Sequence, residues 1–507
     1  MKLLPIRLPP GLERNGTPYD TTNRWWDMNL MRWVSDAARP IGGWVRKTET
    51  PLGDPVRRFH AWSKNDNTRG TLVATDQKLY TDFGGGWLDI TPPGIVPPIN
   101  TLAGGYGTGP YGAGTYGTPR PPTEAFAPGY GLWSFDNWGE DVLFLSSKDN
   151  RLFHYIGSTP DVVPLPLAEP PLSNAVCVTD ERHVMLVGPV IGGTYFPHRV
   201  CWASSESLTD WDFASVTNTA GFLDLTCTSP LNFIVKVREG VLAFTSTEVF
   251  LGTYVGLPYV YGFQKIGEMP LFHPYNIALH NSGHAMWLSP RAMMMYAGGV
   301  IQAMDCPIFN DIKDDFADDW GPIRSHASAN GLFPEVWVFW PSDGATECDR
   351  YVVFNYLDGW WGWGYLNRTA MIRSGALKRP LAGTSDGTIY EHENGWTDAG
   401  LPILDNRWLE SGALGLGDGN QLFDVKQAML ASQDNFHPQK QTVKLQFFGR
   451  YAPDGDERVF GPYLPRLDGY IDTRVNSREA RVRYIGNADA LFDIGLLRLD
   501  VSPGGSR

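Results

Sequence analysis

The sequence has few cysteines, few charges and no long apolar run. Its 507 residues include 5 Cys, which lie far apart and form no CxxC pair. They are Cys177, Cys201, Cys227, Cys306 and Cys348. This arrangement argues against a zinc site and against a disulfide framework, and it favours assembly in a reducing cytoplasm. No stretch of about 18 apolar residues occurs, so no membrane span is predicted.

The charges are sparse and mostly acidic. Lys and Arg number 42 and Asp and Glu number 55, which gives a formal net charge of -13 spread along the chain. A chain of this sign does not attract DNA phosphates through its net field. The first residues include Lys2 and Arg7 but no continuous apolar segment, so we expect no signal peptide.

Motifs of catalytic and metal sites are also missing from the sequence. The ten His residues form no HExxH or HxH cluster, and no GxSxG nucleophile elbow is present. Thr384–Tyr390 and Ser342–Thr346 match only part of the Asp-box turns found in sialidase propellers. We therefore predict a protein that is not an enzyme and that uses no metal or cofactor.

Aromatic residues and turn formers are abundant. The chain has 19 Trp, 21 Tyr, 56 Gly and 39 Pro. This composition is typical of many short strands joined by tight turns rather than of long helices. The sequence therefore predicts an all-β protein.

A strand-turn-strand phrase recurs along the chain. In its clearest copies, Leu72–Tyr80 and Leu381–Tyr390, an apolar strand runs into a Thr/Ser and Asp turn and leaves through Leu or Ile and Tyr. From residue 142 onward the copies begin about every 42 to 57 residues, which is the period of propeller blades. We predict a β-propeller of six or seven blades, although a long sandwich or two stacked barrels would give a similar pattern. The other copies span residues 142–153, 184–202, 241–251, 285–296 and 336–354.

The predicted propeller spans residues 56–400, between two segments of different character. Residues 1–55 are irregular and rich in Trp and Arg, and we expect them to pack on the propeller. Residues 401–507 contain segments in which apolar and polar residues alternate, so we predict an additional C-terminal antiparallel β-domain. The alternating segments are 443–447, 480–484 and 497–501.

Two segments interrupt the predicted blades. Tyr recurs every five residues in the Gly-rich stretch 104–117, within an insert at 97–130 that we expect to be a long mobile loop. Apolar residues recur every four positions from Ile308 to Trp320, which predicts one helix over 307–320. Its aspartates are expected to form a solvated acidic face.

Short phrases near both ends of the chain, and one in the Tyr/Gly-rich insert, carry a resemblance. They are Gly11–Tyr19, Arg24–Trp25, Arg39–Trp44, Tyr116–Arg120, Arg478–Tyr484, Leu496–Val501 and Gly504–Arg507. They resemble the tail nozzle proteins of short-tailed bacteriophages, also described as tail tubular protein B or packaged-DNA stabilisation proteins. No catalytic motif is part of this resemblance.

The resemblance implies a structural virion protein that forms a homo-oligomeric ring, typically a hexamer, below the adaptor (head-to-tail connector) protein. The ring would form the lower tail tube, retain the packaged double-stranded DNA without sequence-specific binding, and release it during genome ejection. Tail fibre or spike proteins would attach nearby. The protein would be assembled in the host cytoplasm and located in the virion tail.

Candidate site residues follow from these patterns. The candidate gate or docking loop contains Gly105, Tyr106, Tyr111 and Tyr116. The candidate contacts with neighbouring subunits or the adaptor are Arg24, Trp25, Arg32, Arg478, Arg481 and Arg483. Arginines that alternate along a strand can pair with carboxylates across an interface, and they can equally lie on a solvated strand face.

A second class of function stays open at this point. A receptor- or glycan-binding tail propeller would present exposed aromatic platforms, for which Trp360, Trp361 and Trp363 are candidates. Tryptophans at this density are also typical of a blade core.

Overall fold

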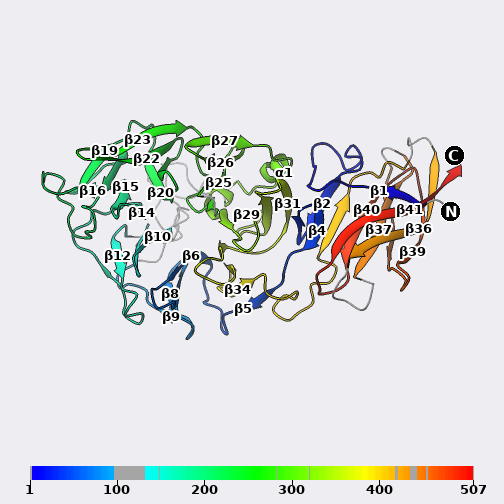
Figure 1. Cartoon of the computed structure of the whole chain (residues 1–507), viewed down its shortest axis with the longest axis horizontal. Coiled ribbons are helices and arrows are strands. Elements are labelled where there is room, and N and C mark those ends of the chain that lie inside the picture. The colour runs from blue at the N-terminus through cyan, green and yellow to red at the C-terminus, as the bar shows by residue number, and fades with distance from the viewer. Residues whose placement is uncertain are drawn as a thin grey trace, which may run out of the picture.

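The chain forms a β-propeller and a β-sandwich that lie side by side (Figure 1). The computed structural model describes residues 3–95, 132–147, 149–280, 283–318, 320–416, 421–433, 442–452 and 455–505. The prediction of an all-β propeller with an additional antiparallel β-domain is confirmed. Within the described ranges, no helix has both the length and the apolar character needed to cross a membrane.

The described residues form seven propeller blades, each a four-stranded antiparallel sheet. Blade 1 consists of β6 (Val56–Ser63), β7 (Arg69–Thr75), β8 (Leu79–Asp82) and β9 (Leu88–Asp89). Blade 2 consists of β10 (Trp133–Trp138), β11 (Asp141–Ser146), β12 (Leu152–Tyr155) and β13 (Leu165–Pro166). Blade 3 consists of β14 (Ala175–Val178), β15 (Val184–Val187), β18 (Arg199–Trp202) and β19 (Gly221–Asp224), with an inserted hairpin of β16 (Val190–Ile191) and β17 (Thr194–Tyr195).

The remaining blades follow the same order. Blade 4 consists of β20 (Leu231–Val237), β21 (Gly240–Thr245), β22 (Val249–Gly256) and β23 (Val260–Gly267). Blade 5 consists of β24 (Ile277–Leu279), β25 (Ala285–Leu288), β26 (Met293–Ala297) and β27 (Val300–Met304). Blade 6 consists of β28 (His326–Ala329), β29 (Glu335–Trp340), β30 (Arg350–Asn355) and β31 (Trp360–Tyr365). Blade 7 consists of β32 (Ala370–Ile372), β33 (Leu381–Gly383), β34 (Ile389–His392) and β5 (Trp44–Arg46).

Each of the seven predicted hairpins is the central strand pair of one blade. In the copy at 381–390, the backbone N–H of Thr388 donates to Oδ1 of Asp386 at 3.1 Å. Gly387 has a φ of 84°, a conformation that a residue with a side chain rarely adopts. The Ser-Asp-Gly sequence therefore forms the tight turn because its side chains satisfy the turn backbone and its glycine accepts the positive φ.

A strand from the N-terminal segment closes the ring of blades. β5 pairs with β34, so that Trp44 lies opposite His392. Gly43 precedes this strand and lies against the backbone of Thr397, because a Cβ on Gly43 would meet the Thr397 carbonyl oxygen at 2.4 Å. The ring is therefore closed by a strand that precedes the predicted propeller range of 56–400 and pairs with a strand near the end of that range.

The sandwich consists of two sheets that share one apolar core. One sheet contains β3 (Met31–Val34), β4 (Ala37–Pro40), β41 (Asp493–Gly505), β36 (Leu422–Gln433) and β39 (Tyr470–Ser477), and β1 (Leu3–Ile6) pairs with β41. The other sheet contains β2 (Trp25–Asn29), β35 (Trp408–Ser411), β40 (Glu479–Gly486), β37 (Val443–Arg450) and β38 (Arg458–Tyr463). The three alternating segments lie in β37, β40 and β41, and their apolar residues face this core.

The N-terminal segment does not form a separate unit that packs on the propeller. Its first strands complete the sandwich and β5 completes blade 7, so the boundaries expected at residues 55 and 401 do not separate bodies in space. Ile6 lies opposite Leu497 in the β1–β41 pair, and both chain ends lie at the far end of the sandwich in Figure 1. Sequence patterns alone do not specify pairing between strands this far apart in the chain.

The single helix predicted over 307–320 is wrong. Two short helices, α1 (Phe309–Asp314) and α2 (Gly321–Arg324), occupy the region. Between them, Phe316 forms a β-bridge with Ser342, and the N–H of Ala317 donates to the Pro341 carbonyl. These contacts with blade 6 end the first helix. The expected acidic face is partly neutralised, since Asp311 pairs with Arg14 and Asp315 pairs with Arg350.

Candidate functional site

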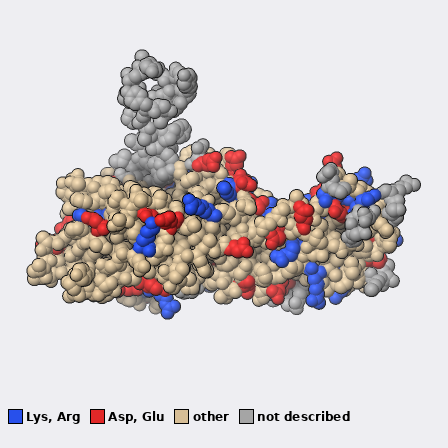
Figure 2. Space-filling model, turned by 90° about the horizontal axis from the view of Figure 1, so that it is seen from above, with Lys and Arg blue, Asp and Glu red and all other residues tan. Residues whose placement is uncertain are grey.

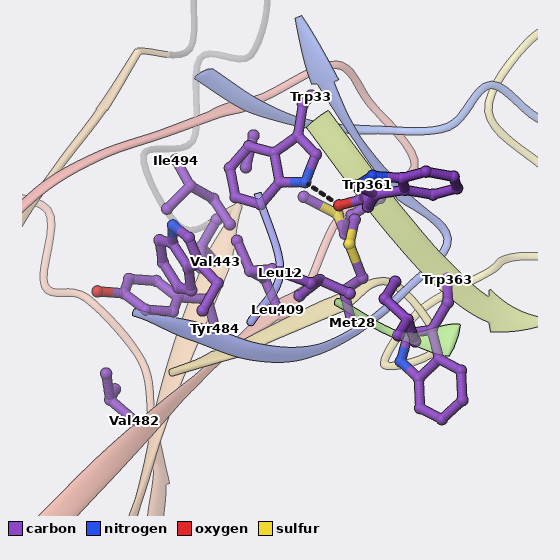
Figure 3. Close-up of a cluster of buried hydrophobic side chains, with 14 of the residues drawn as sticks. Leu12, Met28, Trp33, Trp361, Trp363, Leu409, Val443, Val482, Tyr484 and Ile494 are labelled. Carbon is purple, nitrogen blue, oxygen red and sulfur yellow. Dashed lines mark hydrogen bonds between the residues drawn. The ribbon is translucent and has the colours of Figure 1, made fainter. Parts of the chain in front are cut away.

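The sandwich packs against β31, the outer strand of blade 6, and this junction holds most of the aromatic residues that the sequence singled out (Figure 3). Nε1 of Trp33 donates to the Trp361 carbonyl at 3.1 Å. Nε1 of Trp363 donates to Oδ1 of Asp27 at 2.6 Å. Because the sandwich covers β31, the exposed edge that an outer blade strand would present is absent at this position.

Two glycines in β31 allow the sandwich to approach closely. A Cβ on Gly362 would meet Sδ of Met28 at 3.0 Å, and a Cβ on Gly364 would meet Oδ1 of Asn29 at 2.6 Å. The alternation of Trp and Gly from 361 to 364 therefore serves the docking of β2 on the propeller.

Trp25, a predicted subunit or adaptor contact, lies inside the subunit. Its side chain is 5% exposed and belongs to the core that the sandwich and blade 6 share. Its ring contacts Trp33 at 6.0 Å and Tyr484 at 5.3 Å between centroids. This position identifies Trp25 as a residue that holds the N-terminal strands in the sandwich.

Arg32, another predicted contact, is buried between the sandwich and the propeller. Its Nε lies 3.0 Å from Oε1 of Glu335, and its guanidinium also pairs with Glu393 and lies 3.7 Å from the ring centroid of Phe333. Burial alone would lower the pKa of Arg32, but Glu335 and Glu393 more than offset that effect, so the pKa is raised. Burial raises the pKa of Glu335, which Arg32 opposes. The cluster connects β3 to blades 6 and 7.

Arg481 and Arg483 share the buried carboxylate of Glu410 in the sandwich. Arg481 pairs with Glu410 and, with its Nε at 2.7 Å from Oε1, with Glu457. Arg483 Nε lies 2.5 Å from Oε2 of Glu410. These arginines alternate along β40 as predicted, and carboxylates of the same chain are their partners.

The last two predicted contacts are half-buried residues of the sandwich. The carbonyl of Arg24 accepts the N–H of Gly412 at 2.9 Å, and the N–H of Arg478 donates to the Arg450 carbonyl at 3.0 Å. The structure thus brings the candidates from the two chain ends into one domain. The candidate loop residues Gly105, Tyr106, Tyr111 and Tyr116 lie outside the described residues.

The tryptophans proposed as an exposed platform are largely covered. Trp361 and Trp363 are 4% and 7% exposed. Trp360 is half-buried and lines a cavity of about 590 Å³ at the junction, together with Trp25, Trp33 and Tyr484. Of the two interpretations of these tryptophans, burial in the core is the one that holds for Trp361 and Trp363, because the sandwich packs over β31.

A larger cavity lies on one face of the propeller. We call this the front face; it carries the loops that lead into the first strand of each blade and the turns between the second and third strands. The cavity has a volume of about 700 Å³ and is lined by loops of blades 2 to 6. Sequence patterns did not indicate it, since the residues come from segments far apart in the chain.

The buried thiols and imidazoles are held in their neutral forms. All five cysteines are free, and burial raises the pKa of each thiol, to about 12 for Cys306. Burial lowers the pKa of His273 and His326 to about 3 and that of His280 to about 4. Across the described ranges, no three His, Cys, Asp or Glu side chains are grouped so that they could hold a metal ion.

Comparison with known proteins identifies similar folds. No protein-family model and no curated protein matches the chain. Similar solved structures include a streptogramin B lyase (13% identity, TM-score 0.40, covering 68% of this chain and 95% of that one). Others are YCF48 bound to D1 peptide (9% identity, TM-score 0.38, covering 73% and 98%) and the Cps50 (Swd1) β-propeller domain of Myceliophteria thermophila (10% identity, TM-score 0.33, covering 70% and 99%). These similarities concern the propeller architecture alone.

Proposed function

We propose that this chain is a structural protein of a short-tailed phage virion, a subunit of the tail nozzle ring below the adaptor. It acts without catalysis: the ring provides the channel that retains packaged DNA and releases it during ejection. The subunit is assembled in the host cytoplasm and then resides in the virion tail, beside tail fibres or spikes.

One observation carries this proposal. Most of the phrases that resemble nozzle proteins lie near the two ends of the sequence, and described residues from both ends come together in the sandwich. Trp25 of the N-terminal phrase contacts Tyr484 of the C-terminal phrase, and Ile6 pairs with Leu497 across β1 and β41. Residues that form one domain are expected to be kept or replaced together as the sequence evolves. A resemblance carried by the sandwich would therefore appear at both ends of the chain and not in the blades.

The rigid junction between the two domains also supports a role as a building block. Arg32, Trp33 and Trp363 each bond across it, and the core is continuous from the sandwich into blade 6. A subunit whose domains are fixed by buried contacts can transmit force through a tube wall without internal hinge motion.

The charge of the assembly sets an expectation for the bore. Six copies carry 6 × -13 = -78 formal charges. Acidic and basic side chains are interspersed on the side of the subunit seen in Figure 2, so that side has no field of a single sign. We expect carboxylates to line the bore, because DNA with one charge per about 1.7 Å would be held by a basic wall. A strongly basic bore in a map of the ring would contradict this part of the proposal.

Light scattering of the purified chain mixed with the portal-adaptor complex of its virion tests the proposal. The expected mass corresponds to the adaptor complex plus six copies of this chain. A mass equal to that of the adaptor complex alone, at saturating chain, would reject it.

A receptor- or glycan-binding propeller is the second candidate. Its original support, an exposed tryptophan platform at 360–363, is weakened by the burial of Trp361 and Trp363. The cavity on the front face is a different location for such binding.

A further inference from the structure

The described lining of the cavity of about 700 Å³ on the front face is uncharged. None of the described residues that line it is Asp, Glu, Lys or Arg. The described lining contains one imidazole, that of His273, whose pKa burial lowers to about 3, so it is neutral at pH 7. Pro270 and Pro290 also line a neighbouring cavity, and that one holds the charged residues Glu248, Glu268 and Arg291.

Prolines are frequent in the wall of the cavity, where they reduce the number of backbone donors. Five prolines line the cavity, and proline has no N–H. They are Pro230, Pro270, Pro274, Pro290 and Pro322. Hydrogen bonds to a ligand must therefore come mainly from side chains.

Carboxamide and hydroxyl side chains also line the cavity. Nδ2 of Asn232 donates to Oγ of Ser246 at 2.9 Å, and both residues are exposed. Nδ2 of Asn174 lies 3.3 Å from the hydroxyl of Tyr195 and 2.9 Å from the carbonyl of Leu231. Carboxamides and hydroxyls both donate and accept hydrogen bonds, as the hydroxyl groups of a sugar do.

An inserted element presents an aromatic ring at the rim. Blade 3 has an additional hairpin, β16–β17, between its two central strands, β15 and β18. Tyr195 at the end of this hairpin is 47% exposed. Gly188, which precedes the hairpin, leaves room for Asn174, because a Cβ there would meet Nδ2 of Asn174 at 2.4 Å. An exposed aromatic ring beside directional polar groups is a common arrangement in ligand sites.

We propose that this cavity binds a short, neutral saccharide without a metal ion. The apolar face of a sugar ring stacks on Tyr195, and Asn174, Asn232 and Ser246 bond its hydroxyl groups. The volume lies within the range of small-molecule sites, about 300 to 1,000 Å³. The described lining holds no cationic side chain, which disfavours sialylated or phosphorylated glycans, and no carboxylate, which disfavours recognition through calcium.

The test is a binding measurement on the full chain by calorimetry, with neutral trisaccharides based on glucose, galactose and N-acetylglucosamine. Sialyl-lactose serves as the anionic probe, and a neutral peptide of Pro, Gly and Tyr serves as the competing ligand class. We expect a neutral trisaccharide to bind with an affinity unchanged by EDTA and by high salt, because neither metal nor ion pairing contributes.

Variants locate the site. Tyr195→Ala and Asn232→Ala, both at exposed positions, are each expected to weaken binding by about tenfold, the effect of losing one good contact. The control is Tyr259→Ala, on the hairpin at the opposite face, where the side chain is 78% exposed; it is expected to leave the affinity unchanged. Any of four results would overturn the proposal: no neutral saccharide binds, sialyl-lactose binds better, only the peptide binds, or the variants at 195 and 232 bind as well as the control. The proposal is independent of ring assembly, which light scattering with the adaptor tests separately.

Discussion

Trp25 and Tyr484 pack edge to face, with 5.3 Å between their ring centroids, and so connect the two ends of the chain inside one subunit. Both rings are almost fully buried, at 5% and 1% exposure. The contact places the N-terminal strands in the same domain as the C-terminal ones, so loss of either end is expected to disrupt the whole sandwich.

Replacement of Trp25 tests this role. Trp25→Ala removes a large ring from a packed core and is expected to lower the free energy of unfolding by about 3–5 kcal/mol. Tyr259→Ala, at an exposed position, is expected to change it by less than about 0.5 kcal/mol. Denaturant unfolding followed by Trp fluorescence measures both. If Trp25→Ala kept full stability and impaired only assembly, Trp25 would be a subunit contact as its sequence first suggested.

Arg32 is expected to be among the most sensitive charged residues. Arg32→Met leaves Glu335 and Glu393 buried without their cation, at an expected cost of about 3–5 kcal/mol in unfolding free energy. The matched control is Arg466→Met, whose ion pairs with Asp468 and Asp472 are half-exposed and contribute about 0–1 kcal/mol.

A rescue variant separates charge burial from lost packing. Adding Glu335→Gln and Glu393→Gln to Arg32→Met removes the uncompensated charges and is expected to restore part of the stability. Equal stability of Arg32→Met and Arg466→Met, measured by urea unfolding, would show that the cluster does not hold the two domains together.

Gly43 is expected to tolerate no side chain. In Gly43→Ala the new Cβ would lie 2.4 Å from the Thr397 carbonyl oxygen, so β5 must shift and blade 7 loses its outer strand. We expect a loss of about 1–3 kcal/mol, typical of overpacking. Gly85→Ala is the control, because a Cβ there meets nothing within 4 Å. The melting temperatures of the two variants compare them directly, and equal values would contradict closure by β5.

Stability is expected to fall as the solution becomes acidic. His326 has a pKa of about 3 in the folded chain, below its value of about 6.5 when unfolded, so the unfolded state binds more protons between these values. The contribution of the neutral imidazole is complete above pH 6.5 and is lost as the pH falls toward 3. Each such histidine adds a slope of about 1.4 kcal/mol per pH unit in that window.

His326→Phe isolates this effect. The substitution keeps a ring stacked on Phe339, now 4.7 Å from His326, and removes one titrating group. Between pH 4 and pH 6.5, the unfolding free energy of the variant is expected to change less steeply with pH than that of the unchanged chain. The difference in slope corresponds to one proton, about 1.4 kcal/mol per pH unit. An unchanged slope would mean that His326 is not held neutral in the folded chain.

Much of the propeller could be predicted because its signals are local. Each recurring phrase contains two strands and the turn that joins them, so turn chemistry at Asp386 and Gly387 and the blade period identify all seven central hairpins. The strands of the sandwich that alternate apolar and polar residues were predicted for the same reason.

The remaining features depend on contacts between distant segments. The destination of β5, the pairing of Arg483 with Glu410 and the covering of Trp361 all require a register between strands far apart in sequence. The front-face cavity is formed by loops of five blades, and its one sequence signal is the Gly192-Gly193 turn that marks an additional hairpin in blade 3. Hydrophobic periodicity and composition do not predict contacts between distant segments, because they do not specify which strands pair or in which register.

Negative-stain electron microscopy of the purified chain, alone and with the portal-adaptor complex of its virion, shows whether the chain forms a ring on the adaptor. We expect six-fold rings that cap the adaptor, with each subunit intact as a two-domain body. Persistent monomers that leave the adaptor uncapped would contradict the nozzle proposal.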